Sequence, residues 1–132
     1  MAPTLTVAPQ KYTHVSKVII ETTSIYRIVD ANIFGILLGT VKEDIVTIWD
    51  VYFPSEQERG SSYINPELIE DYSHIWEYLN LRVVGLLYHS NDITGLGLMI
   101  SSLFQEKYME FEEGHQISKF ITMRLQRKSI VI

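Results

Sequence analysis

The sequence predicts a single α+β domain, a mixed α/β arrangement in which helices flank a central, mostly antiparallel sheet. Three observations support this prediction. The chain has 132 residues, a length that suits one domain. Its composition is ordinary for a globular protein, with 46% hydrophobic and 20% charged residues. Short apolar runs typical of strands alternate with helical periodicities, and hairpin connections predominate between the strands.

The composition also limits the classes of partner. The net charge is −5 and the basic residues are spread along the chain, which argues against binding to a nucleic-acid backbone. The absence of cysteine excludes disulfides, a thiolate nucleophile and a cysteine-ligated metal. No signal-peptide pattern is visible, and no apolar run approaches the roughly 20 residues that span a bilayer. We therefore expect an intracellular protein, cytoplasmic or nuclear, that binds neither nucleic acid nor a membrane.

The first half of the chain predicts three strands and one helix. Residues 1–10 carry two prolines and little pattern, so we expect a loose N-terminal segment. Thr22 or Thr23 is suited to cap the helix. Two glycines in the second strand indicate that another group approaches the backbone closely. The predicted elements are a strand at 12–20, a helix at 21–31 with a buried stripe of Ile25, Ile28 and Val29, and strands at 33–41 and 45–53.

Alternation in the strand at 45–53 places apolar residues on both faces, which indicates a strand covered on both sides. Ile45, Trp49, Val51 and Phe53 are predicted on one face, and Val46, Ile48 and Tyr52 on the other. A polar loop at 54–63 follows. Asn65 as cap and Pro66 at the first position then begin a helix that runs to about Leu79. Its predicted core face consists of Leu68, Ile69, Tyr72, Ile75, Trp76 and Leu79.

The apolar run at 83–88 predicts a fully buried central strand that ends at polar residues from His89 onward. A helix with apolar positions from Leu96 to Phe104 follows, and Gly114 is suited to cap its C-terminus. Strands at 117–125 and 128–132 complete the order β-α-β-β-α-β-α-β-β. A buried strand that ends in polar side chains beside a helix start is a common way to build a site.

This order, with GILLG in the second strand and VVGLLYHS in the central one, resembles the MPN fold, also called the JAMM or Mov34 fold. In catalytic members of that family, two His and one Asp bind zinc, and a Glu serves as general base. Zinc needs three protein ligands and one open position, where it lowers the pKa of bound water to about 7.

When these family positions are aligned with this sequence, most of them hold a different residue. Asn32 stands where the Glu is expected, three residues before Gly35. His89 matches the first His, but Asn91 replaces the second, and spacing places Ser102 at the Asp. One ligand of three does not hold zinc. The resemblance therefore implies the metal-free branch of the family: not an enzyme but a pseudoenzyme, with no catalytic residue, no metal and no cofactor.

Shorter pieces refine this likeness. QKYTHV, NLRVVG and SKFIT resemble, in the same order, pieces of the MPN domain of the nuclear protein localization family of ubiquitin adaptors, which serve a AAA unfoldase. The segment NDITGLGL also resembles the metal-free initiation-factor-three subunits of this fold. The first group implies a role in the ubiquitin pathway, and the second implies a place in a large assembly.

We therefore expect a non-catalytic scaffold or protein-binding module with protein partners, such as ubiquitin, an unfoldase or proteasome-type complex, or another MPN-domain subunit, and no small-molecule ligand. One alternative is a divergent JAMM-type zinc isopeptidase that uses His89. The other is a structural subunit of a large assembly, such as a translation or spliceosomal particle. For Ile93 and Leu96, inward packing is an equally weighted alternative to binding. The predicted binding rim consists of Asn91, Asp92, Ile93, Thr94 and Leu96.

Overall fold

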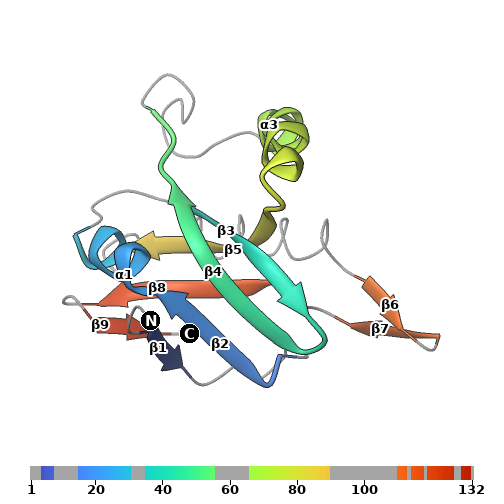
Figure 1. The fold of residues 1–132 in the computed structure, drawn as a ribbon, viewed down its shortest axis with the longest axis horizontal. Coiled ribbons are helices and arrows are strands. Elements are labelled where there is room, and N and C mark those ends of the chain that lie inside the picture. Colours follow the sequence, from blue (N-terminus) through green and yellow to red (C-terminus); the bar gives the residue numbers. More distant parts are fainter. Residues whose placement is uncertain are drawn as a thin grey trace.

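A computed structural model of the chain describes residues 4–7, 15–30, 35–55, 66–89, 110–112, 114–117, 119–126 and 129–131. These residues form a mixed α+β fold, which confirms the predicted class (Figure 1). The elements are β1 (Thr4–Val7), β2 (Lys17–Glu21), α1 (Thr22–Val29), β3 (Gly35–Lys42), β4 (Ile45–Tyr52), α3 (Pro66–Tyr78), β5 (Arg82–His89), β6 (Glu110–Glu112), β7 (His115–Ile117), β8 (Ile121–Gln126) and β9 (Ser129–Val131). Neither described helix has the length and hydrophobicity needed to cross a membrane.

Seven strands form one mixed sheet in the order β1-β2-β4-β3-β5-β8-β9, and β6 and β7 form a separate hairpin. β3 is the middle strand and pairs antiparallel with both β4 and β5. The parallel pairs are β2 with β4 and β5 with β8. The edge strands β1 and β9 each pair antiparallel with their neighbours.

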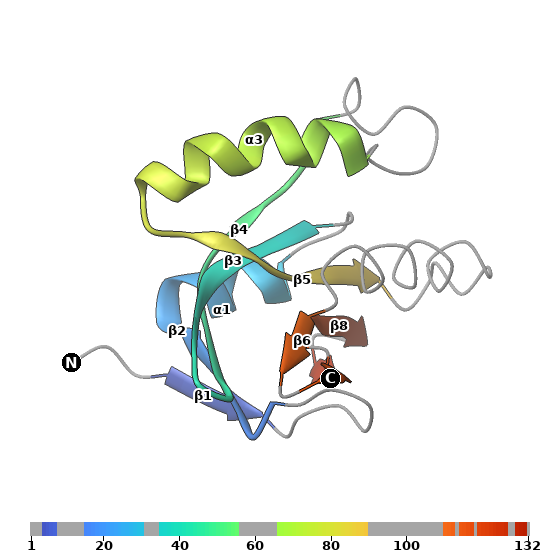
Figure 2. The ribbon, with the colours of Figure 1, turned by 90° about the vertical axis from the view of Figure 1, so that its right-hand side faces the viewer.

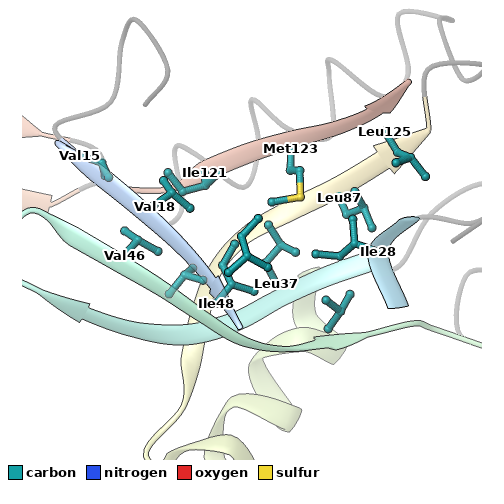
Figure 3. Close-up of a cluster of buried hydrophobic side chains, with 13 residues drawn as sticks. Val15, Val18, Ile28, Leu37, Val46, Ile48, Leu87, Ile121, Met123 and Leu125 are labelled. Carbon is teal, nitrogen blue, oxygen red and sulfur yellow. The ribbon is translucent and has the colours of Figure 1, made fainter. Parts of the chain in front are cut away.

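The sheet curls around an inner core on one of its faces (Figure 3). Val18 of β2 and Ile121 of β8 belong to this core, although three strands separate β2 from β8 in the sheet. Ile28 of α1 and Leu87 of β5 also belong to it. Such curling brings distant strands together on the concave side, where their side chains fill the space between them. Burial of Ile28, with Ile25 packed against the core, confirms most of the stripe predicted for α1.

A second, outer core lies on the opposite face of the sheet, where α3 covers it (Figure 2). Trp76 of α3 packs there with Ile36 and Leu38 of β3 and with Leu86 of β5. β3 and β5 therefore supply side chains to both cores. This explains why residues 83–87 are all buried, whereas Tyr88, the last residue of the predicted buried run, is only partly buried.

A β-bulge changes which side chains of β4 point inward. The pairing with β3 skips Trp49, so this residue is the extra one in its strand. After Trp49, the alternation of inward-facing and outward-facing side chains is shifted by one residue. Val51 therefore lies in the inner core with Val46 and Ile48. The prediction that Val51 shares a face with Trp49 is therefore wrong. Trp49 itself is 50% exposed.

The predicted close approach to a strand glycine is confirmed at Gly39. A Cβ atom at this position would lie 1.9 Å from the carbonyl oxygen of Thr47, which is far inside van der Waals contact. The position lies beside the bulge, where the backbones of β3 and β4 come closer than a side chain permits.

The cap of α1 differs from the prediction. Glu21 occupies the N-cap position, and its carboxylate accepts hydrogen bonds from the hydroxyl of Thr23 and from the Thr23 backbone N–H, the latter at 2.9 Å. The hydroxyl bond in particular lowers the pKa of the Glu21 carboxyl. Because β2 runs directly into α1, the last strand residue is the one that faces the free N–H groups, and neither Thr22 nor Thr23 caps the helix.

Three other element boundaries differ from the prediction, because a short strand forms only where another strand is available to pair with it. Thr4–Val7, in the segment predicted to be loose, pairs with β2. Glu110–Glu112, predicted as a helix end, pairs with His115–Ile117, and Gly114 at φ +79° lies in the hairpin turn between them. The strand predicted at 117–125 therefore splits into β7 and β8. The helix predicted from Leu96 onward and residues 56–63 of the predicted loop lie outside the described residues.

Replacing Val84 by aspartate tests the double burial of β5. Val84 is 1% exposed in the inner core, so the variant buries a charge without a partner. We expect the free energy of unfolding to fall by about 3 kcal/mol or more, measured by urea denaturation. Lys42→Asp, at an exposed end of β3, serves as the control and should change it by about 0.5 kcal/mol or less. Equal stability of the two variants would contradict the placement of β5.

Candidate functional site

Most of the site predicted from the sequence lies outside the described residues. This holds for Asn32, Asn91 and Ser102, which the resemblance aligns with the general base and two zinc ligands, and for the whole predicted rim, Asn91, Asp92, Ile93, Thr94 and Leu96. His89 is the last residue of β5, and its backbone alone is described. Their proposed roles therefore stay predictions.

The backbone around His89 shows which segments meet at this end of the sheet. Gly35, the first residue of β3, pairs with Leu87 near the end of β5. His89 pairs with Leu125 of β8. The start of the GILLG strand and the end of the VVGLLYH strand are therefore direct neighbours. The start of β3 and the end of β5 therefore lie at the same end of the sheet.

The polar contacts near α1 tie this helix to β4. Arg27 forms an ion pair with Asp50, and its guanidinium lies 5.4 Å from the ring centroid of Phe53. Both charged side chains are about half exposed, and such surface pairs contribute little to stability or chemistry. Within the described ranges, no three His, Asp or Glu side chains lie close enough together to bind one metal ion. We therefore regard the Arg27–Asp50 pair as a structural contact.

Helix α3 has an inner aromatic face that fixes it on the sheet. The rings of Tyr52, Tyr72 and Trp76 pack with centroid distances of 5.4 to 5.9 Å. Two of these contacts are edge-on, the geometry that the ring quadrupoles favour. Pro66 begins α3, as predicted, and Tyr72 and Trp76 belong to its predicted core face.

The C-terminus of α3 closes in a Schellman motif. Leu81 donates its N–H to the carbonyl of Trp76 at 3.0 Å, and Asn80 donates to that of Glu77, also at 3.0 Å. Asn80 has the left-handed φ of 57° that this motif requires. Leu81 then packs against the outer core beside Trp76, the apolar contact that accompanies the motif. The turn brings Leu81 inward and leaves Leu79 outside.

An apolar stripe therefore faces solvent along the end of α3. We call Ile75, Tyr78 and Leu79 the outer stripe; they are 59%, 90% and 64% exposed. Ile75 and Tyr78, spaced i and i+3, lie side by side on one face of the helix, and Leu79 is the first residue after its last turn. The sequence prediction placed Ile75 and Leu79 in the core, which is wrong. Scattered exposed apolar residues are ordinary, but adjacent ones mark binding surfaces.

The sequence contained a signal for this stripe. Apolar side chains occupy an arc of α3 that includes Tyr72 and Trp76 and extends through Ile75 to Tyr78. Such an arc is wider than the roughly 100° that one sheet face covers. Asn80 further indicated where the helix stops, so that Leu79 no longer follows the helical period.

Trp49 and Tyr26 are the other large exposed aromatics among the described residues. The indole N–H of Trp49 donates to the hydroxyl of Thr40 at 3.1 Å, which fixes the ring over β3. Tyr26 is 67% exposed on α1. Each stands apart from the outer stripe in the sequence, and neither is part of a row of adjacent apolar side chains on its element.

No protein-family model matches the chain, and no match is found among curated proteins. Evidence for function therefore comes from the residues and their geometry.

Truncation of single side chains separates the two faces of α3. Trp76→Ala removes a buried ring from the outer core, and we expect the free energy of unfolding to fall by about 3–5 kcal/mol. Tyr78→Ala removes a ring that is 90% exposed, and it should change the free energy of unfolding by about 0.5 kcal/mol or less. Thermal and urea denaturation measure both. A large loss of stability in Tyr78→Ala would show that the outer stripe is part of the core.

Proposed function

We propose that the chain is a non-catalytic protein-binding module of the MPN type that acts in the ubiquitin pathway. The observation that carries this proposal is the outer stripe, Ile75, Tyr78 and Leu79, which exposes adjacent apolar side chains on a helix whose other face is held in the outer core. Exposed aromatic and aliphatic side chains on a fixed element are typical anchors of protein interfaces.

The proposed MPN-type fold is supported by the pairing of β3 with β5. In that family the active site combines residues at the start of the first of these strands with residues at the end of the second. Here Gly35 and Leu87 are paired, so the corresponding ends are adjacent. A mixed sheet with α1 and α3 against its two faces is compatible with the same proposal.

The proposed lack of catalysis rests on the chemistry of the residues at these positions. Zinc sites in proteins use thiolate, imidazole and carboxylate ligands. The amide of Asn91 and the hydroxyl of Ser102 offer neither an imidazole nor a carboxylate. Asn32 cannot act as a general base, because an amide has no basic group near neutral pH. With His89 as the remaining ligand, a metal-bound water would not be held.

Metal analysis tests this part of the proposal. Purified protein incubated with zinc and then desalted should retain far less than one zinc per chain, measured by elemental analysis. It should also leave isopeptide-linked ubiquitin dimers uncleaved. Stoichiometric zinc that is lost in His89→Ala, together with cleavage, would favour the divergent isopeptidase instead.

Titration with ubiquitin tests the binding function. We expect ubiquitin to shift the amide resonances of α3, because the outer stripe supplies the apolar anchor. The double variant Ile75→Ser with Tyr78→Ser should weaken binding at least about tenfold, since each residue removed is an interface anchor.

The variant Ile93→Asp with Leu96→Asp distinguishes the two candidate surfaces. Loss of binding only in this variant, with an unchanged melting temperature, would place the interface at the predicted rim and not on α3. Retained binding in both variants would exclude both surfaces. The absence of any ubiquitin binding would favour the role of a subunit in an assembly unrelated to ubiquitin.

A further inference from the structure

The charges on α3 are all of one sign. Within Pro66–Tyr78 the sequence places four acidic residues and neither lysine nor arginine. Glu70, Asp71 and Glu77 are exposed. The helix therefore exposes formal charge of negative sign only, and two of these acids, Asp71 and Glu77, flank the outer stripe.

The helical periodicity places these acids beside the stripe. Asp71 precedes Ile75 by four residues, which puts the two side chains one turn apart on the same face. Glu77 lies next to Tyr78 in the chain and in the last turn of the helix. Asp71 therefore lies on the face of the stripe, and Glu77, about 100° around the helix from Tyr78, lies along one edge of it.

The acidic residue in the last turn is unfavourable in the isolated chain. The C-terminal end of a helix carries a partial negative charge, and a carboxylate there is repelled by it. α3 has no basic residue in its last turn that would offset this repulsion. A cation supplied from outside the helix would therefore interact favourably with both the side chain of Glu77 and the helix end.

We propose that the partner of α3 is a basic amphipathic helix. Its apolar side chains would pack on Ile75, Tyr78 and Leu79, and lysine or arginine side chains beside them would face Asp71 and Glu77. Ile75 and Tyr78, spaced i and i+3, belong to one of the rows that form ridges on a helix and pack into the grooves of a second helix. Charge complementarity at the border of an apolar contact selects the partner and speeds association. This inference rests on the proposed binding function, and it gives the outer stripe a second class of partner, a basic helix, that would compete with ubiquitin for the same surface.

Two synthetic peptides serve as probes. Both form an amphipathic helix with a leucine stripe; lysines flank the stripe in one, and glutamates replace every lysine in the other. Fluorescence anisotropy with the intact chain measures affinity. The lysine peptide should bind at least about tenfold more tightly than the glutamate peptide, and its affinity should fall as salt is raised, because exposed charges are screened.

Charge reversal on the protein provides the matched test. Asp71→Lys with Glu77→Lys should weaken binding of the lysine peptide at least about tenfold, and Lys at position 77 should not destabilise the helix, since it suits a helix C-terminus. Glu43→Lys with Asp44→Lys changes the net charge equally in the exposed β3–β4 turn, at the far end of the sheet from α3, and should leave affinity nearly unchanged (Figure 1).

The outcomes separate the two proposals. Equal binding of both peptides, abolished by Ile75→Ser with Tyr78→Ser, would overturn the basic partner and leave the binding function intact. Equal losses in the two charge-reversed variants would show a general charge effect and would also overturn it. Binding of neither peptide would overturn the basic helix as partner, and the ubiquitin titration would then decide separately whether the outer stripe binds protein.

Discussion

Both faces of β3 and β5 are buried, and the rest of the fold depends on this pair. Leu37 and Leu87 enter the inner core, while Ile36 and Leu86 enter the outer core. A strand pair covered on both sides must be apolar along its length and closely packed against its neighbours. Close packing also explains the glycine in β5: a Cβ atom at Gly85 would lie 2.2 Å from the carbonyl oxygen of Ile121.

Two bulges allow this sheet to curl. One lies at Trp49, where β4 pairs with β3, and the other at Val84, which the pairing of β3 with β5 skips. Bulges bend a strand and increase its twist. In both strands the extra residue lets neighbouring apolar side chains reach the same core: Val51 joins Ile48, and Leu87 joins Val84. The concave side closes around the inner core, so α3 is left to cover the convex side.

The position of α3 on the convex side connects the fold to the proposed function. A single helix on a convex face buries the residues directly beneath it: among the described side chains of α3, Trp76 is buried and Tyr72 is partly buried. The Schellman turn at Asn80 then directs the chain back into β5 and leaves the end of the helix exposed. The outer stripe and its acidic border are thus a consequence of how the helix is seated. In the proposed function they supply an apolar anchor and a charge preference, independently of His89.

The sequence by itself determined the α+β class, most of the buried strand predicted at 83–88 and the start of α3 at Pro66, and it indicated a close approach to the glycines of β3. Composition, periodicity and the geometry of proline and glycine are local properties, which is why the sequence contains them. The comparison of Asn32, Asn91 and Ser102 with a general base and two zinc ligands depends on the family resemblance and stays a prediction. Only the tertiary structure decided the rest. The short strands at Thr4–Val7 and Glu110–Glu112 exist because a partner strand lies beside them.

Tertiary structure also determined which face of its element a side chain occupies, wherever the regular periodicity is interrupted. Because of the bulge at Trp49, Val51 lies in the inner core. Because the helix ends before Leu79, this residue lies at the surface. Ile75 became exposed because the sheet covers a narrower arc of α3 than its apolar residues occupy. The hydrophobicity of a side chain determines how much free energy its burial would contribute. Whether the side chain is buried depends on the elements that pack beside it in the folded structure.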